Sequence, residues 1–306
     1  MGKKREAKVY IGVGQKGVGK TYQTLKIIDQ YVKGNPQVGL LPRKILIFDV
    51  NNEYQKYRAV NCTEGDMKKF RLQKTIEARR ISPLKNNGEA KTRQELIVDL
   101  NIVIKHFYNG CLVLEDLTLI VGDAVSTEVV GSLSTNRHRD LEIITHFQSI
   151  AKFTHPKFSA LKNLLRLHKT EDSCNRNTPK NNLGSHYKKV RIGEIIVGKR
   201  YLQGVIKLRE LESKGLSAGN KEYDFYENNY KRFFLHIDFD ESLIIGGFTK
   251  DEFNDACIQY LQEEDTQEIT PLLKLKDIKT GVSKYTYEQA INEKLIELSL
   301  MYGNRS

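Results

Sequence analysis

The feature that most constrains this chain is a glycine-rich loop placed between an apolar run and a helical pattern. Residues 12–21 read Gly-Val-Gly-Gln-Lys-Gly-Val-Gly-Lys-Thr and contain the pattern G-x-x-x-x-G-K-T. The run 8–13 is typical of a buried strand, and Leu25, Ile28 and Val32 recur on one helical face after the loop. Strand, loop and helix follow in the order of a phosphate-binding loop. The sequence therefore predicts a nucleoside triphosphate site, against the alternative of a glycine-rich turn without a ligand.

The residue types of this loop suit phosphate. Glycines let the backbone curl with its N–H groups pointing inward, toward an anion at the start of the following helix. Lys20 is expected to reach the β and γ oxygens, and the Thr21 hydroxyl to bind a Mg²⁺ ion that bridges them. ATP and Mg²⁺ are the predicted ligands. The predicted nucleotide contacts are Gly14, Gln15, Lys16, Gly17, Val18, Gly19, Lys20 and Thr21.

Composition limits the class of protein. The chain has 306 residues and 39% hydrophobic residues, enough for one large or two small globular domains. Its apolar runs are shorter than a membrane span, and the lysine-rich start lacks the apolar core of a signal peptide. The widely spaced cysteines indicate neither a zinc site nor a disulfide framework. We expect a soluble protein of a reducing compartment; the cysteines are Cys62, Cys111, Cys174 and Cys257.

The positive charge is unevenly distributed. The net charge is +11, yet residues 1–220 hold 39 basic against 21 acidic residues, whereas residues 221–270 hold 13 acidic and 4 basic ones. A surplus of this kind favours a polyanionic partner such as nucleic acid, because phosphate neutralisation supplies most sequence-independent affinity. The alternative is a basic surface that serves only solubility.

Downstream of the loop, apolar runs and helical patterns alternate. Runs 43–50 and 79–82 are predicted strands, and residues 93–108 carry apolar side chains at helical spacing. Strands that alternate with helices are typical of a parallel sheet covered by helices.

A pair of acids ends the next apolar run, 111–116. We interpret Glu115 as the acid that binds Mg²⁺ through water, and Asp116 as the one that polarises the attacking water. The order is the reverse of the usual Asp-Glu. Asp49, near the end of run 43–50, is a competing candidate, and ordinary strand-end acids are the remaining alternative.

A predicted helix, 125–139, precedes a predicted strand, 140–149. Gln148 ends that strand, where its amide could hydrogen-bond the γ-phosphate or the lytic water. Arg137 and Arg139 are candidates for an arginine finger that acts on a neighbouring subunit, or else for cations that suit a helix end. His138 and His146 are expected to be polar packing residues rather than metal ligands.

Taken together, these segments resemble the HerA/FtsK superfamily of DNA-pumping ATPases. The resemblance covers about residues 7–170 and is nearest to viral genome-packaging ATPases, with phage assembly ATPases like zonula occludens toxin as near relatives. Two departures are the Glu-Asp order at 115–116 and Asn51-Asn52, where relatives often carry Pro and Gly. The segments are the loop 14–21, the run 45–54 ending in Asp-x-x-x-Glu-Tyr, the acidic strand end 112–116, and Asn-Arg-His-Arg at 136–139 leading into 143–148.

This resemblance implies a RecA-like P-loop core that forms a homo-oligomeric ring, usually a hexamer, around double-stranded DNA. It implies ATP-driven DNA movement, a capsid or portal protein as a further partner, and a location in host cytoplasm or with a viral particle. The toxin-like branch normally carries a membrane span, and the apolar runs of this sequence are too short for one. Packaging therefore ranks first. A phage assembly ATPase, a P-loop small-molecule kinase and a nucleotide-gated scaffold stay as alternatives.

The remaining sequence is less informative. We expect an ATPase domain over 1–250, with a polar, DNA-facing or merely solvated loop at about 171–191, and a helical extension over 251–306. Residues 195–211 fit a helix or extended chain, and 232–239 alternates like a strand that joins the sheet. The pattern Thr249-x-x-Glu252 predicts a helix start. A final amphipathic helix is expected over about 286–302.

Overall fold

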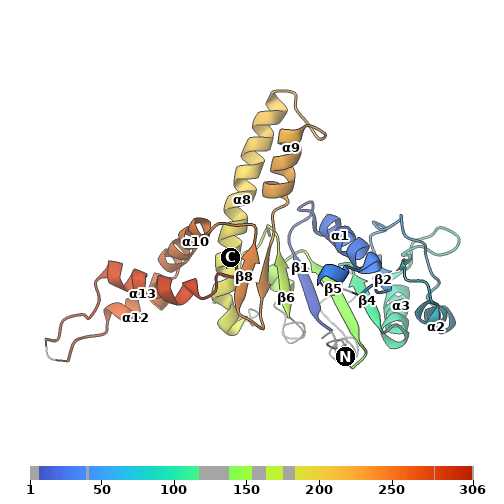
Figure 1. Cartoon of the computed structure of the whole chain (residues 1–306), viewed down its shortest axis with the longest axis horizontal. Helices are drawn as coiled ribbons and strands as arrows, with labels where there is room; N and C mark the ends of the chain where they lie inside the picture. Colours follow the sequence, from blue (N-terminus) through green and yellow to red (C-terminus); the bar gives the residue numbers. More distant parts are fainter. Residues whose placement is uncertain are drawn as a thin grey trace. The chain divides into compact units, whose positions relative to one another are not determined.

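A computed structural model gives the fold of this chain (Figure 1). The chain divides into two compact units, Met1–Leu165 and Arg166–Ser306. None of the helices among the residues described is both long enough and apolar enough to cross a membrane. The residues that the structure describes are 7–38, 41–116, 138–153, 163–174, 183–278 and 280–304.

The first unit is built on parallel strands. Each neighbouring pair in the order β3-β2-β4-β5-β1 is parallel. Strand β6 contains the point at which the chain divides. The strands of this part are β1 (Val9–Val13), β2 (Ile45–Phe48), β3 (Ala78–Ile81), β4 (Gly110–Leu114), β5 (Leu141–Phe147) and β6 (Leu164–Leu167).

Register brings the strand ends of the first unit to one edge. Phe48 pairs with Leu114, Leu114 with Thr145, and Val13 with Phe147. The residues that follow β1, β2, β4 and β5 therefore lie along the carboxyl edge of the sheet, where ligands bind in open α/β folds. Strands β2 and β4 are buried throughout, as expected for strands covered on both faces.

Helices connect these strands. Thr63 caps α2, and Thr92 with Glu95 forms a capping box at the start of α3, which satisfies backbone N–H groups of the first turn. Helix α1 buries Thr24, Ile28 and Tyr31. The elements are α1 (Lys20–Lys33), η1 (Pro36–Val38), α2 (Glu64–Leu72), α3 (Arg93–His106) and α6 (Ile150–Phe153). The expected helix 125–139 lies almost wholly outside the described residues.

The second unit combines a long helix, a strand pair and a C-terminal helical group. Figure 1 shows α8 and α9 running side by side as a hairpin. Strands β7 and β8 pair antiparallel. Its elements are η2 (Gly184–His186), α8 (Tyr187–Ser213), α9 (Lys221–Tyr226), η3 (Glu227–Lys231), β7 (Leu235–Asp238), β8 (Leu243–Gly246), α10 (Lys250–Glu263), α11 (Asp265–Glu268), α12 (Thr270–Leu273) and α13 (Tyr287–Ser299).

The expected fold class is confirmed: an α/β protein with a mainly parallel sheet, covering helices and helices at the C-terminal end. The capping box of Thr249 and Glu252 begins α10 as predicted. Residues 195–211 are helical within α8, which settles the alternative left open by the sequence. Strand β8 was not expected.

The polar segment ending at Arg191 differs from the expected loop. Residues 187–191 are helical, within α8, and Lys189 is buried. Lys188 pairs with Glu268 and Arg191 with Glu263, at 2.9 and 2.6 Å. These cations are neutralised within the second unit, so they do not form the free DNA-facing cluster that the sequence suggested. Residues 175–182 lie outside the described part.

Two glycines of α8 give a matched stability prediction. A Cβ on Gly204 would lie 2.7 Å from Cβ of Tyr230 and 2.8 Å from the backbone nitrogen of Lys231, whereas a Cβ on Gly198 meets nothing within 4 Å. Gly204→Ala should lower the free energy of unfolding by about 1–3 kcal/mol through overpacking. Gly198→Ala should raise it by about 0.5–1 kcal/mol, because alanine is the better helix former. Urea unfolding of both variants checks this, and equal effects would contradict the close approach of α8 and η3.

Candidate active site

The predicted phosphate loop lies between β1 and α1, at the carboxyl edge of the sheet. The Gly14 N–H donates to the Phe147 carbonyl at 3.1 Å, which ties the loop to the end of β5. Gly17 and Gly19 have φ of 82° and 88°, in the left-handed region that side chains disfavour. A Cβ on Gly17 would meet nothing within 4 Å, so backbone conformation rather than space requires glycine there.

The two polar side chains at the start of α1 have partners within the first unit. Lys20 Nζ donates to the carbonyls of Gly14 and Gln15, at 2.6 and 2.8 Å. The Thr21 hydroxyl donates to Glu53 Oε2 at 2.8 Å. The ammonium group thus lies over the loop whose backbone would surround phosphate, and the hydroxyl lies beside a carboxylate that follows β2.

Asp116 and Gln148 are in direct contact. They follow β4 and β5, which are neighbours, and Gln148 Nε2 donates to Asp116 Oδ2 at 2.6 Å. Asp116 has a left-handed backbone with φ of 39°, an uncommon state for a residue other than glycine. Such conformations persist where the surrounding structure holds them, often at functional sites. The sequence-predicted acid and amide therefore come together at this edge.

Glu115 is buried and receives two hydrogen bonds on one oxygen. The Tyr54 hydroxyl donates to Oε1, and His146 Nδ1 lies 3.0 Å from the same oxygen. Burial raises the pKa of this carboxyl, but the two partners and the charge of Lys20 outweigh burial and hold it below its ordinary value. Glu115 is thus a carboxylate at neutral pH. Burial and the neighbouring Glu115 charge raise the pKa of Tyr54 above its ordinary value, so its hydroxyl stays protonated.

Asp49, the competing acid, has partners that shape the turn after β2. Its carboxylate accepts the backbone N–H groups of Glu53 and Tyr54, at 2.8 and 3.1 Å, and pairs with Arg80 at 3.1 Å. Asn52 in this turn has φ of 56°. Asp49 therefore holds the segment that presents Glu53 and Tyr54.

Arg139, one of the two candidate arginine fingers, is not brought to the phosphate loop. Arg139 precedes β5 and so lies toward the amino edge of the sheet, away from the strand ends. Its guanidinium donates to the last carbonyls of α3, including Lys105 at 3.0 Å and Phe107 at 3.2 Å. The positive group suits that helix end. Arg137 lies outside the described residues.

Sequence reasoning assigned no site role to several side chains that gather here. Glu53 contacts Thr21, while Tyr54 and His146 contact Glu115. The Asp-x-x-x-Glu-Tyr pattern drew attention to the segment after β2 but not to these contacts. His146 is a buried polar residue, and its position two residues before Gln148 was the available signal.

The oxygen donors near Thr21 fit a divalent cation. Mg²⁺ prefers oxygen ligands and keeps several waters. The Thr21 hydroxyl and the Glu53 carboxylate are already in contact, and Glu115 is ionised. These residues could hold Mg²⁺ together with phosphate oxygens, Glu115 acting through water.

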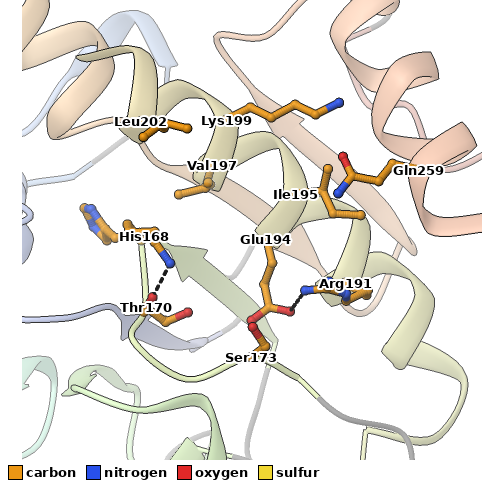
Figure 2. A pocket seen from close by; sticks show the side chains of 12 residues that line it. His168, Thr170, Ser173, Arg191, Glu194, Ile195, Val197, Lys199, Leu202 and Gln259 are labelled. Carbon is orange, nitrogen blue, oxygen red and sulfur yellow. Dashed lines mark hydrogen bonds and ion pairs between the residues drawn. The ribbon is translucent and has the colours of Figure 1, made fainter. Parts of the chain in front are cut away.

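A separate hollow lies in the second unit (Figure 2). Its volume is about 290 Å³, and its walls include His168, Arg191 and Glu194. Figure 2 shows Glu194 extending from α8 toward Ser173, with a dashed line to Arg191. Burial raises the pKa of Glu194 to about 7. Residues of the phosphate loop do not line this pocket, so the chemistry of the loop, and not the depth of a hollow, identifies the candidate active site.

Comparisons with known proteins give fold-level neighbours. The sequence matches no model of a known protein family and no curated protein. The genome packaging NTPase B204 of Sulfolobus turreted icosahedral virus 2, solved with ATPγS, is 16% identical with a TM-score of 0.42, over 79% of this chain and 97% of that one.

Two further solved structures are similar at lower scores. The N-terminal domain of zonular occludens toxin from Neisseria meningitidis is 11% identical with a TM-score of 0.30, over 60% of this chain and 91% of that one. PCH-2 of C. elegans is 11% identical with a TM-score of 0.29, over 95% of this chain and 61% of that one. Structures of both kinds that the sequence motifs resemble, a viral packaging NTPase and a zonular occludens toxin, are thus among the neighbours of this chain.

Proposed function

We propose that this chain is an ATPase that couples ATP hydrolysis to DNA movement, of the kind that packages viral genomes. The observation that carries the hydrolytic part is the gathering of complementary groups at one sheet edge. The phosphate loop with Lys20, the ionised Glu115 and the Asp116–Gln148 pair all follow neighbouring parallel strands. This arrangement supplies a phosphate cradle, an acid for a metal-bound water and an acid with an amide for the attacking water.

Each residue has a distinct proposed role. Lys20 leaves the loop carbonyls and binds the β and γ oxygens, which offer it a full negative charge. Asp116 accepts a proton from the attacking water, and Gln148 fixes the direction of that carboxylate. Thr21 and Glu115 hold Mg²⁺, which, when bound, neutralises charge that develops on the γ-phosphate.

The DNA part of the proposal rests on charge and resemblance. Residues 1–220 hold 39 basic and 21 acidic residues, a surplus that a polyanion would neutralise. The motif resemblance adds a homo-oligomeric ring, six subunits being usual, with double-stranded DNA as substrate and a capsid or portal protein as partner. Host cytoplasm or a viral particle is the proposed place of action.

Arginine fingers stay part of the proposal at a lower rank. For Arg139 to reach a neighbouring subunit's γ-phosphate it would have to leave the carbonyls at the end of α3. Arg137 lies outside the described residues, and both arginines stay candidates for action in trans.

A second candidate function is nucleotide-gated binding without appreciable hydrolysis. It is favoured by one observation: both acids are occupied, Glu115 by Tyr54 and His146, and Asp116 by Gln148. Acids held in this way can bind a metal ion or stabilise a nucleotide complex without activating water. Persistent ATP binding without phosphate release would support this alternative.

Steady-state phosphate release from ATP tests the proposal. We expect Mg²⁺-dependent release that rises several-fold with double-stranded DNA, and a stimulation that weakens as salt is added, because phosphate contacts release counterions. Heparin serves as the control polyanion, since a DNA motor should respond to DNA more strongly than to charge alone. Equal release with and without DNA would contradict coupling to DNA, and transfer to a small acceptor would favour a kinase.

A further inference from the structure

A buried chain of hydrogen bonds links Glu115 to the helix that begins at the phosphate loop. His146 Nε2 lies 2.9 Å from the hydroxyl of Thr24 in α1, and His146 Nδ1 lies 3.0 Å from Glu115 Oε1. The Tyr54 hydroxyl donates to the same oxygen. The four side chains that it joins, those of Thr24, Tyr54, Glu115 and His146, are all buried. Buried polar groups that satisfy one another define a single geometry, because water cannot replace a lost partner.

The acceptor determines where the protons lie. An ionised carboxylate has no proton to give, so His146 must carry its proton on Nδ1 and donate to Glu115. Nε2 faces the Thr24 hydroxyl at 2.9 Å, and a hydroxyl can either donate to this nitrogen or accept from it. Tyr54 and His146 are both donors to Oε1, which leaves Oε2 as the oxygen with acceptor capacity for the metal-bound water.

The partners come from different segments of the first unit. Thr24 lies in α1, Tyr54 in the turn that Asp49 shapes after β2, and His146 in β5. The rotation of the Glu115 carboxylate is thus set by three elements that border the phosphate loop. Side chains that orient a metal-binding or reacting group in this way typically affect activity by about 10–100-fold when removed.

We propose that Tyr54 and His146 are positioning residues that hold Glu115 for ATP hydrolysis. We call their two contacts with Glu115 the clamp, and Thr24 couples it to α1. The proposal rests on the proposed ATPase function and assigns residues that the loop motif does not include. In this proposal Tyr54 and His146 fix Oε1 of Glu115, so that Oε2 faces the nucleotide side. If His146 served only to fill space, its burial would matter, but it would not matter which ring nitrogen carries a proton.

Isosteric substitutions of His146 separate the roles of its two ring nitrogens. His146→Asn can keep a donor at the position of Nδ1, whereas His146→Gln can keep a partner for Thr24 at the position of Nε2. We expect His146→Gln and Tyr54→Phe each to lower kcat by about 10–100-fold with ATP affinity unchanged. His146→Asn should retain most of the parent turnover. The double variant of Tyr54→Phe and His146→Gln should lose less than the product of the single losses, because both act through one carboxylate.

The outcomes are distinct. Parent turnover in His146→Gln, or equal losses in His146→Asn and His146→Gln, would overturn the positioning role. Thermal unfolding of each variant shows whether a loss reflects folding instead. If the parent chain releases no phosphate, the proposed function fails, and the imidazole nitrogen signals of ¹⁵N-histidine protein then decide the contact. A proton on Nδ1 of His146 supports the clamp, and a proton on Nε2 alone overturns it.

Discussion

Lys20→Ala is expected to abolish ATP turnover and to weaken ATP binding strongly. The Lys20 ammonium lies 2.6 and 2.8 Å from carbonyls of its own loop, so it is already directed over the cradle. Without it, the β and γ oxygens would lose a positively charged partner supplied by the protein. Truncating one partner of a close charge pair costs about 2–5 kcal/mol, which corresponds to about 30- to 5000-fold in affinity. Equilibrium binding of a fluorescent ATP analogue and phosphate release measure the two effects.

Lys16→Ala is the matched control for this prediction. It removes the same charge from the same loop, but the Lys16 side chain is exposed. Screening by solvent makes such a charge worth little. Affinity for ATP should therefore change only slightly in Lys16→Ala. Equal losses in the two variants would show that the loop attracts nucleotide by its overall charge, and would contradict a specific contact of Lys20.

Much of the first unit, and the start of one helix of the second, could be predicted from the sequence because the signals are local. The apolar run before the loop, the glycines and the helical face after it describe β1, the loop and α1 within a short stretch. The Thr-x-x-Glu pattern at 249–252 predicted the start of α10 because a capping box is made within one turn. Strand-end acids and amides were predictable because parallel strands end at a common edge.

The errors arose where distant partners decide the structure. The segment around Lys188 and Arg191 looked like a solvated basic loop, yet it is helical and its cations pair with acids about 70 or more positions away. Strand β8 is short, and besides β7 it contacts the C-terminal segment, where Ile244 forms a bridge with Tyr302. Local propensity cannot report pairing of this kind, since the stabilising contacts are absent from any short window of sequence.

The candidate site likewise combines residues that local sequence could predict with contacts that it could not. The loop residues and the acid pair are motif positions, so sequence could name them. The contacts of Tyr54 and His146 with Glu115 join residues separated by 61 and 31 positions. Their existence depends on strand order, which places β5 between β1 and β4. A histidine within an apolar strand gave no chemical role until its neighbours were known.

The roles of the acids can be separated by amide substitution, and Asp116→Asn is expected to give the larger loss. Asp116 touches Gln148 and has the strained backbone, whereas one oxygen of Glu115 is already occupied by two donors. If Asp116 is the general base, Asp116→Asn should lower kcat by about 10²–10⁴-fold while ATP still binds. Phosphate release at saturating ATP and Mg²⁺ provides the measurement.

Two companion variants show which acid serves the metal and which the water. Glu115→Gln should raise the Mg²⁺ concentration needed for half-maximal turnover, because its role is to hold a metal-bound water. Glu53, whose carboxylate accepts the Thr21 hydroxyl at 2.8 Å, is the competing base. Full loss in Glu53→Gln with turnover retained in Asp116→Asn would move the base to the turn after β2 and would contradict the assignment made from the acid pair. The reverse result would place the proton-accepting group beside Gln148, where the end of β5 also anchors the phosphate loop through Phe147 and Gly14.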